Sequence, residues 1–267
     1  MPTKPIYQYD EILRTHVARV VAVARFDGLE ESQKALYKNG GEDTYVVETN
    51  ETIFYAQGGG QPFDTGFMTT NSDQAKFEVQ AVRNAGEGRV LHFGVFKGTQ
   101  FEQGSMVEQR IDGERRDANS RSHTAGHTIG LAVRRLAEKT PGLDVTELKA
   151  QHYPDASFVE FKGTIDGKYK DAIQEQASAY VRDALPVKLY WFKPEQLAEN
   201  GVITAEGMPI VAGQDGNVRV VDIVGAGAYP CGGTHVPDTS YIGQVIVKGI
   251  KRQKGISKVS YTVTSPA

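Results

Sequence analysis

The chain has 267 residues, of which 39% are hydrophobic and 24% are charged, with a formal net charge of −3 and one cysteine. This composition is typical of a globular protein with one or two domains, and it excludes an extensively disordered chain. A lone cysteine cannot form an internal disulfide, no apolar run approaches the ~20 residues needed to cross a bilayer, and no signal peptide is visible at the start. We therefore expect a cytoplasmic protein with no membrane partner.

Residues 1–113 show the pattern of strands and turns. Residues 16–25 and 44–49 are rich in β-branched side chains that roughly alternate with others, which is typical of strands. Glycine-containing turn signals follow at intervals, among them residues 39–41 and 58–60. Short strands with frequent turns favour a small closed barrel, because closure removes exposed sheet edges. We predict a β-barrel domain over residues 1–113.

The pattern changes at residue 114. Asn119 or Ser120 can cap a helix that runs past Arg135 and ends before Pro141, and residues 169–184 carry a second helical stripe. Alternating segments that predict strands return at residues 218–223, 243–247 and 259–263. The fold class we predict is α+β: the barrel domain, followed over residues 114–267 by a domain with helices on an antiparallel sheet.

Two short strings, remote in the chain, predict one metal site. His123 and His127 stand four residues apart on the first helix, so both rings lie on one face. Cys231, the lone cysteine, and His235 have the same spacing in a segment whose Gly232 and Gly233 permit a tight turn. Three histidines and a cysteine are a ligand set that zinc takes in a tetrahedral site. We expect one bound Zn²⁺.

The residues around the first string limit the chemistry. Thr124 occupies the place where a helical metalloprotease needs a glutamate, which disfavours that class. Gly126 and Gly130 form a smooth strip on the helix, which either admits a substrate or another backbone, or packs closely against the sheet. Four protein ligands leave no open position on zinc, so a structural ion is the competing interpretation.

The chain resembles a known family over nearly its whole length. Four segments carry the resemblance in order: residues 54–66 (FYAQGGGQPFDTG), 121–127 (RSHTAGH), 152–160 (HYPDASFVE) and 231–236 (CGGTHV). Together they look like the editing domain of alanyl-tRNA synthetase, and more closely like its free-standing relatives, the AlaX-type trans-editing proteins. The resemblance implies a hydrolase that removes a wrongly attached amino acid, serine or glycine, from alanine tRNA. Without an aminoacylation domain before the match, it would act in trans.

The resemblance also implies site residues. Zinc would be held by His123, His127, Cys231 and His235. The substrate pocket would include Thr124, Gly126, His152, Gly232, Gly233 and Thr234. The glycine-rich loop, Gly58, Gly59, Gly60 and Gln61, matches a segment of the family's N-terminal domain. It is either a turn of the barrel or, as we prefer, a loop that approaches the zinc site across the domain interface.

Three positions depart from the family pattern. Gly126 stands where the synthetase editing domain often carries threonine, which predicts a wider pocket and, as an alternative substrate, threonine or another β-hydroxy amino acid. His152 replaces a glutamine-containing pattern, and it either donates to the substrate or is inert. Residues 254–258 (KGISK) stand where synthetases usually place two arginines.

The partner we expect is tRNA. Basic residues cluster on both sides of the metal strings, and we predict phosphate contacts from Arg115, Arg116, Lys251, Arg252, Lys254 and Lys258. The loop at residues 58–62 lacks the Lys-Ser/Thr of a P-loop, and residues 225–227 lack the third glycine of a dinucleotide site, so neither ligand is expected. A small-molecule ester or amide hydrolase and a non-enzymatic RNA-binding module with structural zinc remain alternatives. The sequence leaves the oligomeric state open.

Overall fold

The structure is a computed structural model, in which residues 1–70, 75–204, 210–213 and 215–264 are described. The chain is mostly β with few helices, a coarser description than the predicted α+β class. It divides into two compact units, residues 1–58 with 62–116 and residues 59–61 with 117–267. None of the helices in the described part combines the length and apolar character needed to span a bilayer.

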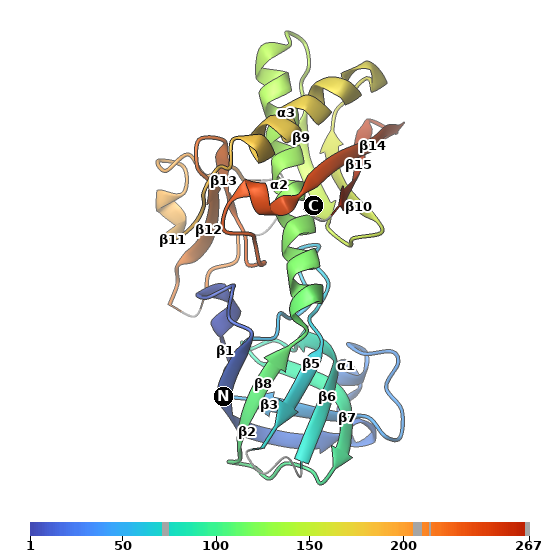
Figure 1. The fold of residues 1–267 in the computed structure, drawn as a ribbon, viewed down its shortest axis with the longest axis vertical. Coiled ribbons are helices and arrows are strands. Elements are labelled where there is room, and N and C mark those ends of the chain that lie inside the picture. The colour runs from blue at the N-terminus through green and yellow to red at the C-terminus, as the bar shows by residue number, and fades with distance from the viewer. Residues whose placement is uncertain (71–74, 205–209, 214, 265–267) are drawn as a thin grey trace. The chain divides into compact units, whose positions relative to one another are not determined.

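The first unit contains the expected closed barrel, with the strand order β2-β3-β7-β6-β5-β8 (Figure 1). Its strands are β2 (Thr15–Arg25), β3 (Tyr45–Thr49), β5 (Gly66–Thr69), β6 (Ala75–Asn84), β7 (Val90–Gly98) and β8 (Met106–Ile111). The short elements are β1 (Lys4–Pro5), which pairs in parallel with β4 (Glu51–Thr52), helix α1 (Glu31–Lys34), and the 3-10 turns η1 (Ile6–Gln8) and η2 (Phe26–Gly28). The two strands predicted here correspond to β2 and β3.

The barrel interior holds a buried histidine with a protein partner at each ring nitrogen. His92 lies on β7, and its Nδ1–H donates to the Val47 carbonyl oxygen at 2.9 Å. Its Nε2 therefore accepts the hydroxyl of Thr52, at 2.8 Å. Burial lowers the pKa of His92 to about 4, so the ring is neutral at physiological pH.

Arg116 overturns one sequence prediction. Instead of contacting phosphate from the surface, its side chain is fully buried in the first unit and ion-paired with the equally buried Asp64. The guanidinium also donates to the carbonyl oxygens of Ile53 and Glu11, and Asp64 accepts the Tyr55 N–H at 2.7 Å. A guanidinium with these partners and no exposed surface does not reach a nucleic acid.

The second unit is organised around two antiparallel sheets and two helices (Figure 1). The larger sheet has the order β14 (Gln244–Gln253), β15 (Ile256–Thr264), β10 (Ser157–Lys162), β9 (Thr146–Gln151), and the smaller one has β11 (Val187–Phe192), β12 (Val218–Ile223), β13 (Gly227–Pro230). The helices are α2 (Gly113–Lys139) and α3 (Lys170–Arg182), with the 3-10 turns η3 (Gly167–Tyr169), η4 (Pro194–Gln196) and η5 (Thr239–Ile242). Ile173 and Ala177 of α3, Ile129 of α2 and Val247 of β14 belong to one core.

Helix α2 begins earlier than the sequence predicted. The carboxylate of Asp112 accepts the backbone N–H of Arg115 at 3.0 Å, which makes Asp112 the N-cap and Gly113 the first helical residue. The proposed caps, Asn119 and Ser120, are buried inside the helix. An Asp-Gly pair is common in turns, but here the aspartate caps the helix.

The other predicted elements of the second unit are present. Residues 169–184 correspond to α3, and the strand at 218–223 coincides with β12. Strands β14 and β15 extend beyond the predicted 243–247 and 259–263 because a tight hairpin joins them. In that hairpin Lys254 and Gly255 both have a positive φ, +50° and +78°.

Candidate metal centre

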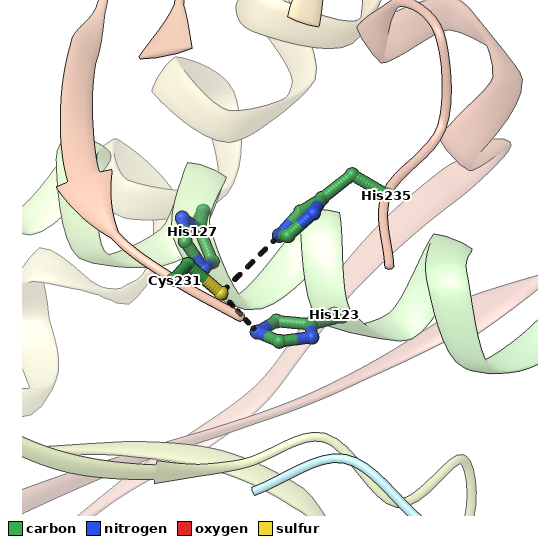
Figure 2. A group of neighbouring side chains, drawn as sticks. All are labelled: His123, His127, Cys231 and His235. Atoms are coloured by element: carbon green, nitrogen blue, oxygen red, sulfur yellow. Dashed lines mark hydrogen bonds between the residues drawn. The ribbon is translucent and has the colours of Figure 1, made fainter. Parts of the chain in front are cut away.

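The two remote strings meet in the second unit. One ligand atom from each of His123, His127, Cys231 and His235 lies within 4.8 Å of all the others. Figure 2 shows the four side chains directed toward one point, two from a helix and two from the segment after β13. The Cys231 Sγ lies 3.4 Å from Nε2 of His123 and 3.7 Å from Nε2 of His235. The cluster could hold a metal ion.

Helix α2 supplies two of these groups because its periodicity stacks positions four apart. The ring centroids of His123 and His127 are 5.1 Å apart, and His235 lies 4.6 Å and 5.0 Å from them. Burial, and then the neighbouring imidazoles, lower the pKa values of His123 and His127 well below the ordinary value. The rings are therefore neutral and offer lone pairs, the form in which imidazole binds a metal.

The segment after β13 is held against the helix by a close approach and an arginine clamp. A Cβ atom at Gly233 would lie 2.1 Å from Cε1 of His123, so only glycine fits. Arg219 of β12, missed by the sequence analysis, donates to the carbonyl oxygens of Cys231 at 2.6 Å and Gly233 at 2.9 Å. Burial raises the pKa of the Cys231 thiol, but His235, the Arg219 guanidinium and the Gly233 N–H together hold it below its ordinary value.

Gln61 fixes the orientation of His123. The backbone N–H of Thr234 donates to Gln61 Oε1 at 2.9 Å, which identifies that atom as the amide oxygen. The same oxygen lies 2.7 Å from Nδ1 of His123, so Nδ1 carries the proton and Nε2 presents its lone pair toward Cys231. A histidine that ligates a metal usually has its second nitrogen held in this way.

His127 completes a donor set that fits a metal. Its buried Nδ1 has no hydrogen-bond partner among the described residues, so no such bond fixes its tautomer. A buried polar atom in that state costs free energy unless a bound ligand or a water satisfies it. Three imidazoles, of which those of His123 and His127 are neutral, and a thiol of lowered pKa are donors suited to a borderline or soft metal ion.

The glycine-rich loop contributes backbone as well as Gln61. Gly60 has a φ of +78°, and a Cβ atom there would lie 2.5 Å from the Ala150 carbonyl oxygen. Its own carbonyl oxygen accepts the N–H of His152 at 2.8 Å. Gly59 lines the cavity described below, whereas the carbonyl oxygen of Gly58 accepts the Tyr55 hydroxyl in the first unit. The close approach at Gly60 brings this loop against β9.

The structure corrects the expectation that Gly126 widens the pocket. A Cβ atom at Gly126 would lie 2.2 Å from Cε1 of His152, so the imidazole occupies the space that a side chain would take. His152 stacks on His123 with centroids 4.3 Å apart. Tyr261 donates to the Ser122 carbonyl oxygen at 2.9 Å and therefore accepts from Nδ1 of His152 at 2.8 Å. Burial lowers the pKa of His152 to about 3.

A cavity of about 340 Å³ opens beside the cluster, all of it within the second unit. Its lining includes His123, His127 and Cys231, together with Gly126, His152 and Gly232. Three other predicted pocket residues, Thr124, Gly233 and Thr234, are buried and do not line it. The Thr124 hydroxyl donates to the Ser120 carbonyl oxygen, and Thr234 Oγ1 bonds to Ser120 Oγ, so these two threonines position the ligand segments.

Among the lining residues that the sequence analysis did not predict, two form a polar pair. Glu147 on β9 and Tyr229 on β13 meet at the cavity, with the Tyr229 hydroxyl donating to Glu147 Oε2 at 3.1 Å. A Cβ atom at Gly130 would lie 2.6 Å from that oxygen. The strip formed by Gly126 and Gly130 is thus filled by side chains from the sheets, which favours close packing over the entry of a substrate along the helix. No sequence motif marks Glu147.

The remaining basic candidates lie in different settings. Lys251 and Lys258 line a second cavity of about 560 Å³ with Lys248, and Lys258 Nζ lies 3.5 Å from the Phe158 ring centroid. Arg252 lies 3.5 Å from the Asp166 carboxylate. Two further candidates are Lys254, in the hairpin between β14 and β15, and Arg115, whose Nε donates to the Phe63 carbonyl oxygen at 2.9 Å.

Similarity to known proteins agrees with the positions of these elements. Residues 218–260, which include the Cys231–His235 segment, match the sequence model of the threonyl and alanyl tRNA synthetase second additional domain, and residues 3–115 match that of class II (A) tRNA synthetases. The chain carries alanyl-tRNA synthetase-type domains. They confirm the family resemblance that the four sequence segments indicated.

Individual alanine–tRNA ligases and an editing protein are similar to this chain over most of its length. The chain is 30% identical over 266 residues to an alanine–tRNA ligase of Halorubrum lacusprofundi, covering 91% of this chain and 27% of the ligase. It is 29% identical over 253 residues to the alanine–tRNA ligase of Thermotoga maritima, with 90% and 27% covered. It is 26% identical over 228 residues to the alanyl-tRNA editing protein AlaX-L of Pyrococcus horikoshii, with 83% and 52% covered. The chain thus spans about a quarter of these ligases and about half of AlaX-L.

Proposed function

We propose that this chain is a zinc-dependent aminoacyl-tRNA deacylase that acts in trans. One observation carries the proposal: two pairs of zinc-type ligands, more than a hundred positions apart in the sequence, meet in one cluster, and three of the four line a cavity. The similarity to a protein named as an alanyl-tRNA editing protein supports it. In this proposal residues 1–113 and 114–267 are separate domains, and the second one carries the deacylase site.

The reaction is hydrolysis of the ester that joins an amino acid to the terminal ribose of tRNA. Water adds to the ester carbonyl carbon, the bond from that carbon to the ribose oxygen breaks, and the ribose oxygen takes a proton. Zinc, when bound, would lower the pKa of a water or hold polar groups of the amino acid in register. Gln61 and Arg219 contribute by fixing the ring of His123 and the backbone of the Cys231 segment.

We propose serine or glycine on alanine tRNA as the substrate. A larger substrate such as threonine would need free space at Gly126, and His152 fills that space. A cavity of about 340 Å³ is at the lower end of the range for small-molecule sites, which suits a small acyl group.

For tRNA we propose phosphate contacts from the lysine-lined cavity on the larger sheet. Lys248, Lys251 and Lys258 place three cations around one cavity, in which Asp155 is the one acidic lining residue of the described part. Further candidates for phosphate contacts are Arg252, Lys254 and Arg115. Arg116 is not one of them, because its side chain is buried. Contacts of this kind make binding weaken steeply with salt, since each releases condensed counterions.

A panel of charged tRNAs tests the proposal. The zinc-loaded protein is mixed with alanine tRNA carrying serine, glycine or alanine, and with threonine-charged tRNA, and the remaining ester is measured with time. We expect loss of the seryl or glycyl ester while the alanyl ester persists. Survival of every ester at high enzyme concentration contradicts the proposal. Cleavage of free seryl methyl ester as fast as seryl-tRNA would instead indicate a small-ester hydrolase.

One observation favours a second candidate, an RNA-binding module with structural zinc. Four protein groups are available, and a tetrahedral ion bound by all four has no position left for substrate. The His123→Ala variant separates the two. Under the deacylase proposal it loses ester hydrolysis while tRNA binding at the lysine-lined cavity persists. A module without activity would show tRNA binding in both proteins and hydrolysis in neither.

A further inference from the structure

Glu147 is a half-buried carboxylate that forms no ion pair within the described residues. It lies on β9 and lines the cavity beside the metal cluster. The Tyr229 hydroxyl donates a hydrogen bond to Glu147 Oε2 at 3.1 Å. Lys149, the cation that also lines this cavity, is paired with Glu160 at 3.4 Å. Holding a carboxylate out of water without a cationic partner costs free energy, and this burial raises the pKa of Glu147 to about 7. Such a group is a candidate for ligand binding.

The carboxylate is held close to the metal ligands. The Tyr229 ring packs edge-on against His127 with centroids 4.8 Å apart, and its hydroxyl reaches Glu147. Gly130 leaves the room for this pair, because a Cβ atom there would lie 2.6 Å from Glu147 Oε2 and 2.9 Å from the Tyr229 oxygen. One side chain therefore separates the carboxylate from the cluster, and both face one cavity.

The ligand that complements this arrangement carries a cation near a group held at the metal. An aminoacyl ester has that form, because its α-ammonium nitrogen is two bonds from the ester carbonyl carbon. We propose that Glu147, oriented by Tyr229, binds the α-ammonium group of the aminoacyl moiety. The inference rests on the proposed function for the identity of the substrate. It assigns Glu147 to recognition of a free amino group, so the site favours aminoacyl over N-acylated or hydroxyacyl esters.

Binding of two matched analogues tests this assignment without catalysis. The first is 3′-seryl-amino-3′-deoxyadenosine, whose amide is not hydrolysed readily, and the second carries a hydroxyl in place of the α-ammonium group. Calorimetry with zinc-loaded protein should show tighter binding of the ammonium compound by ~10–100-fold, the range for hydrogen bonds to charged groups. Glu147→Gln should remove this preference while leaving the affinity for the hydroxyl compound within about two-fold, since the shape is kept.

Control variants separate recognition from a structural role. Glu175→Gln removes an exposed carboxylate of α3 that pairs with Arg182 and does not line the cavity, and should keep the preference. Gly130→Ala displaces the Glu147 carboxylate without deleting it and should reduce the preference, which provides a test if Glu147→Gln does not fold. Zinc content is measured in each variant to show that the cluster is intact.

The outcomes keep the two proposals distinguishable. A preference unchanged in Glu147→Gln, or equal loss of both analogues, overturns the role of Glu147 even if tRNA hydrolysis is intact. Wild-type protein that binds neither analogue overturns it as well. A preference that depends on Glu147 in a protein that hydrolyses no aminoacyl-tRNA supports the inference and contradicts the deacylase proposal.

Discussion

The barrel and the second unit bury the same polar residue types and use them differently. In the barrel, His92 has a protein partner at both ring nitrogens. Gln109 accepts the Ile53 N–H and donates to the Glu51 carbonyl oxygen and the Thr49 hydroxyl. In the second unit, the clustered histidines face a thiol and one another. The amide oxygen of Gln61 accepts a hydrogen bond from Nδ1 of His123. A buried histidine is structural when the protein satisfies it fully, and it indicates a ligand site when its nitrogens converge on other donors.

Loss of a metal ligand should have the largest effect, because it removes the zinc site of the second unit and leaves the barrel unchanged. Cys231→Ala removes the thiol from the cluster, and we expect the zinc content of the purified protein to fall from about one ion per chain to near zero, because the cluster then offers only its three imidazoles. His92→Gln in the barrel is the matched change and should leave the zinc content as it was. Zinc retained by Cys231→Ala, measured by mass spectrometry of the metal, would contradict the assignment of this ligand.

Breaking the buried ion pair of the barrel should cost stability without touching the metal. Arg116→Met leaves the Asp64 carboxylate buried without a cation, and removal of one partner from such a pair costs about 3–5 kcal/mol. Urea unfolding measures the change, and Arg116→Met/Asp64→Leu should recover part of it. The salt dependence of tRNA binding should not change. If the variant is as stable as the wild type and its tRNA binding depends less steeply on salt, Arg116 contacts phosphate as the sequence predicted.

Acid should distinguish the barrel histidine from the clustered ones. The pKa of His92 is about 4 in the folded protein and 6.5 in the unfolded chain, so the unfolded state binds more protons between these values. Its contribution to stability is therefore present above about pH 6.5 and is lost as the pH falls toward 4, by about 3 kcal/mol in total. The difference in pH dependence between wild type and His92→Gln, followed by urea unfolding, isolates this contribution. It should persist after zinc is removed; a difference that vanishes with zinc would assign the effect to the cluster.

The sequence predicted what local patterns determine. Alternation of β-branched residues located β2, β3 and β12, and the four-residue spacing on a helix identified His123 and His127 as neighbours. The second pair followed from its residue types, because a lone cysteine beside two glycines and a histidine suggests a ligand turn. These inferences need no knowledge of what packs on the segment.

The sequence did not reveal features that depend on packing between distant segments. Arg116 follows another arginine at a helix start, a pattern typical of a solvated face, and only the fold reveals Asp64 opposite it. Gly126 suggested free space until His152, from another element, was seen to fill it. Glu147 belongs to no motif, since its proximity to Tyr229 joins two separate sheets.

The two buried glutamines provide the finest test of the comparison. Gln61 and Gln109 are both fully buried, and each accepts a backbone N–H at its amide oxygen and donates from its amide nitrogen to a threonine hydroxyl. They differ in the third bond: Gln61 Oε1 also accepts Nδ1–H of His123, whereas Gln109 Nε2 also donates to the Glu51 carbonyl oxygen. Replacing each by methionine therefore removes similar hydrogen bonds, and both variants should lose stability by similar amounts.

Only Gln61→Met should weaken the metal site. Without the acceptor, His123 is free to rotate and to change tautomer, and loss of an outer-shell partner typically lowers metal affinity by about 10–100-fold. Competition with a chelator of known affinity measures this in the folded variants, and Gln109→Met should match the wild type. Equal zinc affinity in the two variants would mean that the bond from Gln61 supports the loop alone. The orientation of His123 would then come from its stacking on His152, whose ring lies 4.3 Å away.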